Sequence, residues 1–332
     1  MILKGQLEIA FSSRHQTQLD ESNFKSIDDK GINEFIEIFS SKIIEWGDIS
    51  FTTKIDWSHL KSVILESYDE SGRFYMTHEN TLYKQLTGLE TVIIPIVLGI
   101  SNTTKTEEVI FAFKKHLMDV FLISNLAVPG LVNFYNAKLI FKKDEKESLK
   151  LSSFYFEKSL ENQFLPKVPF TKVYSVEQAN SWYKHLDTGT VLIADSPIQK
   201  ALYSLLHICK MDADISMVPW IFHALEAIYG TNAGRGFNDL STRINFLLNI
   251  EERERKRLKS NLRNLNNLRS AFVHGGYRVS HPLEEDVSDD IFQLTEFGVV
   301  LIISSLQQMM HNRWFGLQAI ESFIGVTKNI GK

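Results

Sequence analysis

The chain has 332 residues, 44% hydrophobic and 23% charged, which is typical of a globular protein with room for two domains. A net charge of −4 and a pI near 6.2 exclude a protein that binds nucleic acid through a uniformly basic surface, although they allow a local basic patch. The single cysteine, Cys209, excludes an intramolecular disulfide and a multi-cysteine zinc site. The start, MILKGQLEIAF, lacks the basic and apolar blocks of a signal peptide, so we expect a cytoplasmic protein.

Residues 1–190 predict a mixed α/β domain. Strands are expected where apolar residues alternate or β-branched residues cluster, at 3–11, 49–55 and 90–100. Helices are expected where apolar residues recur at helical spacing, at 32–46 and 106–126. Weak alternation over 139–158 indicates an exposed hairpin around 142–150, and 164–170 reads as a loop. The apolar runs 91–100 and 297–306 are too short to cross a bilayer, so we expect both in the core and no membrane association.

From about residue 192 the pattern changes to successive helices. They are expected at 196–211, 217–229, 240–250, 251–274, 289–314 and 315–324. Ser196 and Pro197 are a typical N-cap and first helical residue, and Gly230 is a typical helix end. Residues 191–332 therefore predict an all-α bundle, and the chain as a whole predicts the α+β class.

One residue interrupts the apolar stripe of the helix expected at 251–274. In LKSNLRNLNNLRSAFVHGG (258–276), leucines recur at three- and four-residue steps, and Arg269 lies one turn after Leu265. A guanidinium cannot be neutralised by burial, so it needs a partner or an aqueous cleft. His274 follows five residues later, and Gly275 and Gly276 are expected to end the helix. The arrangement predicts a functional site.

The spacing of Arg269 and His274 is weak as a motif on its own. Arg73 and His78 have the same spacing, but they lie between turn signals and outside any amphipathic helix. We interpret that second pair as coincidence.

The residues RSAFVHG at 269–275, preceded by IFHALEAIYG at 221–230, resemble the HEPN superfamily and, within it, the Apea-like HEPN group. The resemblance covers about residues 195–315 and implies a helical bundle. Active members are metal-independent endoribonucleases without cofactors, often toxins or effectors of antiviral defence and abortive infection. They commonly dimerise, so that two copies of the motif form one cleft.

Carried over to this chain, the resemblance implies that Arg269 and His274 are the catalytic pair, with Ser270 in the polar position. It also implies an RNA substrate, a homodimer and a phage-derived or host trigger. Some members have a tyrosine two residues after the histidine, where this chain has Gly276.

The residue chemistry suits RNA cleavage. Attack by the 2′-hydroxyl needs a base, an acid for the leaving 5′-oxygen and positive charge at the phosphate. Histidine can act as either base or acid near neutrality, and arginine binds phosphate oxygens through a planar fork. Five residues turn a helix by about 140°. Arg269 and His274 therefore diverge within one chain, and a two-fold pairing of helices would bring both types together.

Two structural interpretations remain open. Arg269 can pair with Glu226 while His274 caps the helix C-terminus, and Glu226 can orient Arg269 in either case. The basic residues Arg255, Lys259, Arg263 and Arg278 can form a solvated helix face or guide an RNA backbone.

The alternative function is a non-catalytic module that dimerises or binds a nucleotide or partner protein. In the ribonuclease interpretation, residues 1–190 would sense, regulate or recruit, since no catalytic constellation is visible there.

Overall fold

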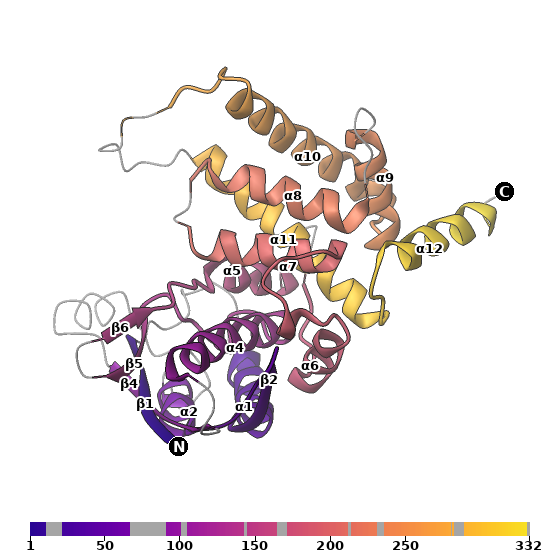
Figure 1. Ribbon diagram of the computed structural model, residues 1–332. Helices are drawn as coiled ribbons and strands as arrows, with labels where there is room; N and C mark the ends of the chain where they lie inside the picture. The colour runs from indigo at the N-terminus through magenta and orange to yellow at the C-terminus, as the bar shows by residue number, and fades with distance from the viewer. Residues whose placement is uncertain are drawn as a thin grey trace. The chain divides into compact units, whose positions relative to one another are not determined.

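The computed structural model describes residues 1–10, 22–66, 91–100, 105–142, 145–164, 171–211, 214–230, 236–279, 281 and 289–330. Within these ranges it contains eleven α-helices, one short 3-10 helix and six strands (Figure 1). The α+β class is confirmed at this level. The chain divides into two compact units, residues 1–157 with 173–192, and residues 158–172 with 193–332.

The first unit contains one antiparallel sheet in the order β2-β3-β4-β1-β5-β6. Its strands are β1 (Ile2–Ala10), β2 (Ser41–Trp46), β3 (Ile49–Ile55), β4 (Thr91–Ile100), β5 (Ala137–Lys142) and β6 (Glu145–Ser148). The strands predicted at 3–11, 49–55 and 90–100 and the hairpin near 142–150 are confirmed. β4 alternates, because Val92 and every second residue to Ile100 are buried whereas Ile93 is 45% exposed.

The helices of this unit are α1 (Ser22–Phe39), α2 (Ser58–Glu66), α4 (Thr106–Ala127) and α6 (Val176–Lys184). Helix α5 (Phe154–Phe164) begins in this unit and ends in the second. The prediction of a helix at 106–126 is confirmed by α4. The chain turns after it at Gly130, which has a φ of +83°. α1 packs against α2 and α6, while α4 packs against α6 and the strands β2 and β3.

The helix predicted over 32–46 is wrong in its second half. α1 ends at Phe39, and residues 41–46 form β2, which pairs with β3 from Ser41↔Lys54 to Trp46↔Ile49. The neighbouring apolar residues Ile43 and Ile44 fit a helical or a strand period equally, and pairing with β3 decides between them. The expected loop at 164–170 begins at Phe164, the last residue of α5, and its other residues lie outside the described ranges, as do Arg73 and His78.

The second unit contains the predicted succession of helices. They are α7 (Pro197–Cys209), α8 (Met217–Tyr229), α9 (Gly236–Leu247), α10 (Glu252–Val273), α11 (Asp289–His311) and α12 (Leu317–Ile330). Ser196 caps α7 in a reciprocal capping box with Gln199, and Gly230 ends α8 with a φ of +58°. Both end signals were predicted correctly.

The helices α8, α10 and α11 pack closely together (Figure 1). Gly298 of α11 marks the closest approach, because a Cβ there would lie 2.7 Å from Ile221 Cγ2 and 2.9 Å from Leu265 Cδ2. The apolar run 297–306 lies within α11 and is largely buried, as expected. Among the described residues, none of the helices is long and apolar enough to span a bilayer.

Candidate functional site

Arg269 is positioned by the packing of α10 on α8. Leu258, Leu262 and Leu265 of α10 are buried, and the stripe reaches the surface of the bundle one turn later, at Arg269. Its Nη1 donates a hydrogen bond of 2.7 Å to Glu226 Oε1 of α8. Its guanidinium carbon lies 4.7 Å from the centre of the Phe222 ring, a cation–π contact. Arg269 thus projects from α10 onto the surface of α8.

The Arg269–Glu226 ion pair is the contact that the structural interpretation anticipated, and it leaves the guanidinium accessible. The side chains of Arg269 and Glu226 are 35% and 39% exposed. A guanidinium has five N–H donors, and the bond to Glu226 uses one of them. The arrangement therefore holds the cation in place while leaving donors for an anion such as phosphate.

His274 occupies the C-cap of α10 and is exposed. Its backbone N–H donates to the Ser270 carbonyl at 3.0 Å, Gly275 turns the chain with a φ of +74°, and the Tyr277 N–H donates to the Ala271 carbonyl at 3.0 Å. The predicted helix stop at Gly275 is confirmed. Within the described ranges the His274 imidazole makes no hydrogen bond, so it is available to an incoming group.

Among the described residues, no hydrogen bond or ring contact joins Arg269 to His274. Arg269 is held against α8 by Glu226, whereas His274 and Ser270 are exposed on another side of α10. This follows from the helical spacing, because five residues turn the chain by about 140°. The structure thus joins Arg269 with Glu226 and Phe222, and within the described ranges the side chains of Ser270 and His274 make no contact with them.

The predicted basic residues Arg255, Lys259, Arg263 and Arg278 are all exposed. The first three are spaced by four residues, so they share one face of α10. Arg255 Nε donates to the Ile250 carbonyl at 3.1 Å, and the Arg263 guanidinium lies 5.9 Å from the centre of the Phe237 ring. At helical spacing this basic face continues along α10 toward Ser270 and His274.

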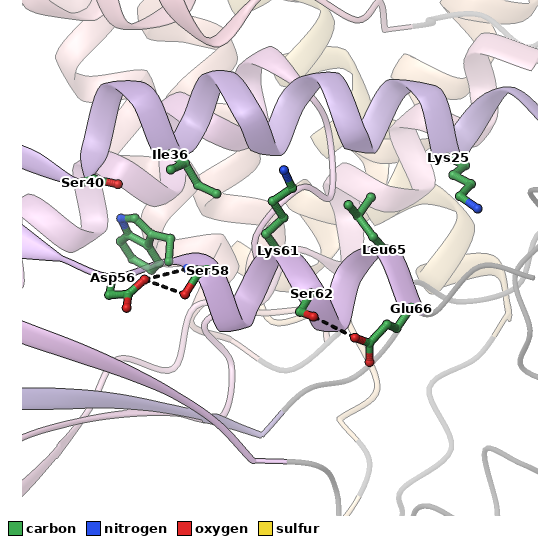
Figure 2. Close-up of a pocket in the computed structure, with 10 residues that line it drawn as sticks. Lys25, Ile36, Ser40, Asp56, Ser58, Lys61, Ser62, Leu65 and Glu66 are labelled. Carbon is green, nitrogen blue, oxygen red and sulfur yellow. Dashed lines mark hydrogen bonds between the residues drawn. The ribbon is translucent and has the colours of Figure 1, made fainter.

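The first unit has a hollow of about 520 Å³ between α1 and α2 (Figure 2). Its polar groups are bonded to their own neighbours. Lys61 Nζ, which points toward α1 in Figure 2, donates to Asn33 Oδ1 at 2.6 Å, and Ser62 Oγ donates to Glu66 Oε1 at 2.7 Å. Asp56 accepts bonds from the backbone and hydroxyl of Ser58, which lower the pKa of its carboxyl. These contacts stabilise the helix pair, and they supply no reactive group.

A buried ionic cluster in the first unit was not foreseen from the sequence. Lys115 Nζ lies 2.9 Å from Asp119 Oδ2 and donates to the Thr188 carbonyl at 2.7 Å, while Tyr183 Oη donates to Asp119 Oδ1 at 2.7 Å. Burial raises the pKa of Asp119, and Lys115 and Tyr183 act against that shift. The adjacent His116 has a buried, unpartnered Nε2, and burial lowers its pKa to about 3. The cluster ties α4 to α6 and to the 3-10 helix Thr188–Thr190.

The described residues contain no group of three or more potential metal ligands. No family model, curated protein or solved structure matches this chain. The functional interpretation therefore depends on the residues themselves and on the motif resemblance.

Proposed function

We propose that this chain is a metal-independent endoribonuclease of the HEPN type, with a composite Arg269/His274 site formed by two copies of the chain. The observation that carries the proposal is the accessible guanidinium of Arg269, held on a helical bundle by Glu226 and Phe222. A cation placed in this way can bind a phosphodiester and stabilise the charge that develops during cleavage.

The separation of Arg269 and His274 within one protomer supports a site built from two copies. His274 is exposed at the end of α10, where a second chain can approach, and the two-fold pairing of identical surfaces is the commonest mode of dimerisation. The basic face of α10 would guide the RNA backbone toward this cleft. We further propose a cytoplasmic toxin or effector in antiviral defence, activated by a phage-derived or host trigger, with the first unit as its sensing or recruiting part.

The alternative is a non-catalytic module that dimerises or binds a nucleotide or partner protein. The ion pair between Arg269 and Glu226 favours this alternative, because it gives the arginine a purely structural partner. Under this alternative, replacing Arg269 would weaken partner binding, and neither the wild type nor the variant would cleave RNA.

Cleavage of labelled RNA by the purified full-length chain separates the two functions. Arg269→Ala and His274→Ala should each abolish cleavage. The matched controls are Arg253→Ala and His185→Ala, which remove an exposed arginine of α10 paired with Glu251 and an exposed histidine of the first unit. Equal activity in the wild type and the Arg269→Ala variant would contradict the proposal.

Mixing the two inactive variants tests whether the site is composite. If arginine of one copy acts with histidine of the other, a mixed dimer retains one intact site. Refolding Arg269→Ala with His274→Ala should then restore part of the activity. If each chain uses its own pair, the mixture stays inactive and the composite site is wrong.

A further inference from the structure

His223 lies on α8, three residues before Glu226, the partner of Arg269. Its side chain is exposed, and Glu226 follows it by three residues on the same helix. Side chains with that spacing are neighbours, about 5–6 Å apart at Cβ. Phe222, the residue before His223, is the ring beneath the Arg269 guanidinium. Helical spacing therefore places the exposed His223 imidazole about one turn of α8 from the Glu226 carboxylate that holds the Arg269 guanidinium.

The hydrogen bonds of Ser204 assign the tautomer of His223. Ser204 is buried on α7, and its hydroxyl donates to the Lys200 carbonyl at 2.8 Å. That donation uses its one proton, so the same oxygen accepts from His223 Nδ1, 2.8 Å away. The neutral imidazole consequently carries its proton on Nδ1, and its Nε2 presents a lone pair. This is the form that a general base requires.

Aromatic contacts hold the ring in place. The Trp220 indole meets the His223 ring edge-on, with the ring centres 6.3 Å apart and the planes at 80°. On α7, His207 stacks on the same indole at 4.1 Å with the planes only 7° apart. The orientation of His223 is thus defined by α7 and α8, the two best-packed neighbours in the bundle, and not by a loop.

We propose that His223 is a further catalytic residue of the Arg269 site, acting as the base that takes the proton of the attacking 2′-hydroxyl. This inference rests on the proposed ribonuclease function. The 2′-oxygen forms a bond to phosphorus, the bond from phosphorus to the 5′-oxygen breaks, and the 2′-hydroxyl proton moves to His223 Nε2. The leaving 5′-oxygen receives a proton from the His274 imidazolium of a second copy. The products are a 2′,3′-cyclic phosphate and a 5′-hydroxyl, and both imidazoles return to their starting states by exchange with solvent.

The proposal assigns different tasks to the two histidines. The titratable groups near His223 are Glu226, which follows three residues later on α8 and is paired with Arg269, and His207 of α7, which stacks on the Trp220 indole that His223 also contacts. Arg269 keeps its charge throughout the accessible pH range. The rising limb of the pH–rate profile should therefore report the base, His223.

His223→Gln in the full-length chain tests the role, because glutamine can keep the bond to Ser204 but cannot accept a proton. We expect a loss of about 10²–10⁴-fold in kcat with KM nearly unchanged. The rising limb of the pH–rate profile should disappear. His185→Gln, which changes an exposed histidine bonded to Ser181, is the matched control and should retain wild-type kinetics.

A second variant guards against a folding defect. His223→Ala leaves a ring-sized gap at an exposed position, and added imidazole should restore part of the activity. Loss of cleavage in Arg269→Ala and His274→Ala but not in His223→Gln would overturn the role of His223 and leave the proposed function standing. An uncleaved substrate with the wild-type chain, both alone and with a lysate of phage-infected cells as the trigger, would overturn both.

Discussion

Replacing Arg269 by methionine should separate its structural contribution from its chemical one. The change removes an ion pair of 2.7 Å and a cation–π contact of 4.7 Å. Because both charged side chains are more than a third exposed, the ion pair contributes at most about 1 kcal/mol. The cation–π contact adds about 0.5–1 kcal/mol at such a site. Methionine retains part of the packing on Phe222 through its flexible, polarisable side chain.

The expected cost is thus about 1–2 kcal/mol, which corresponds to a fall of about 2–8 °C in Tm for a unit of this size. Differential scanning calorimetry with far-UV circular dichroism measures it. Arg263→Met on the same helix is the control, since its guanidinium contacts only the Phe237 ring at 5.9 Å among the described residues. A loss above about 4 kcal/mol, or failure to fold, would show that Arg269 is a structural residue and would refute the reasoning.

Two further perturbations test the energetics of the fold. Because the pKa of His116 is lowered to about 3, the unfolded chain binds a proton below pH 6.5 that the folded chain does not, and stability is lost as the pH falls. Between pH 7 and pH 5, the free energy of unfolding should fall by about 2 kcal/mol less in His116→Phe than in the wild type, as measured by urea titration at both pH values. The same fall in both proteins would contradict the burial of Nε2. Ser196→Ala should cost about 1 kcal/mol because it breaks the capping box with Gln199, while Ser196→Asp should not, and equal stability of the two variants would argue against the cap.

Most helices could be predicted from the sequence because their signals are local. Apolar spacing and end residues placed α4, α7, α8, α10 and α11 close to their observed bounds. The failure at 41–46 has a non-local cause, since Ile43 and Ile44 become a strand only through pairing with β3. The short helices α2, α5 and α6 were missed because they carry too few periodic residues to stand out, and α5 occupies residues 154–158, where weak alternation was expected.

The residues of the candidate site likewise differ in whether local sequence signals or non-local packing reveal them. Arg269 and Glu226 were found because a charge interrupts an apolar stripe and the partner lies at the edge of another. The sequence gives no indication of a role for His223, since nothing in it shows that Ser204, 19 residues earlier, reaches its Nδ1. That contact arises from the packing of α7 on α8, and a pattern within one helix does not reveal it. A site shared between copies is likewise invisible in the spacing of a single chain.

The most direct test of the central claim is cleavage of RNA by the full-length chain in EDTA, with the product ends identified by mass spectrometry. We predict metal-independent cleavage that leaves a 2′,3′-cyclic phosphate and a 5′-hydroxyl, and that is lost in Arg269→Ala and His274→Ala. Cleavage that requires a divalent cation, or that persists without the Arg269 guanidinium, would contradict the account.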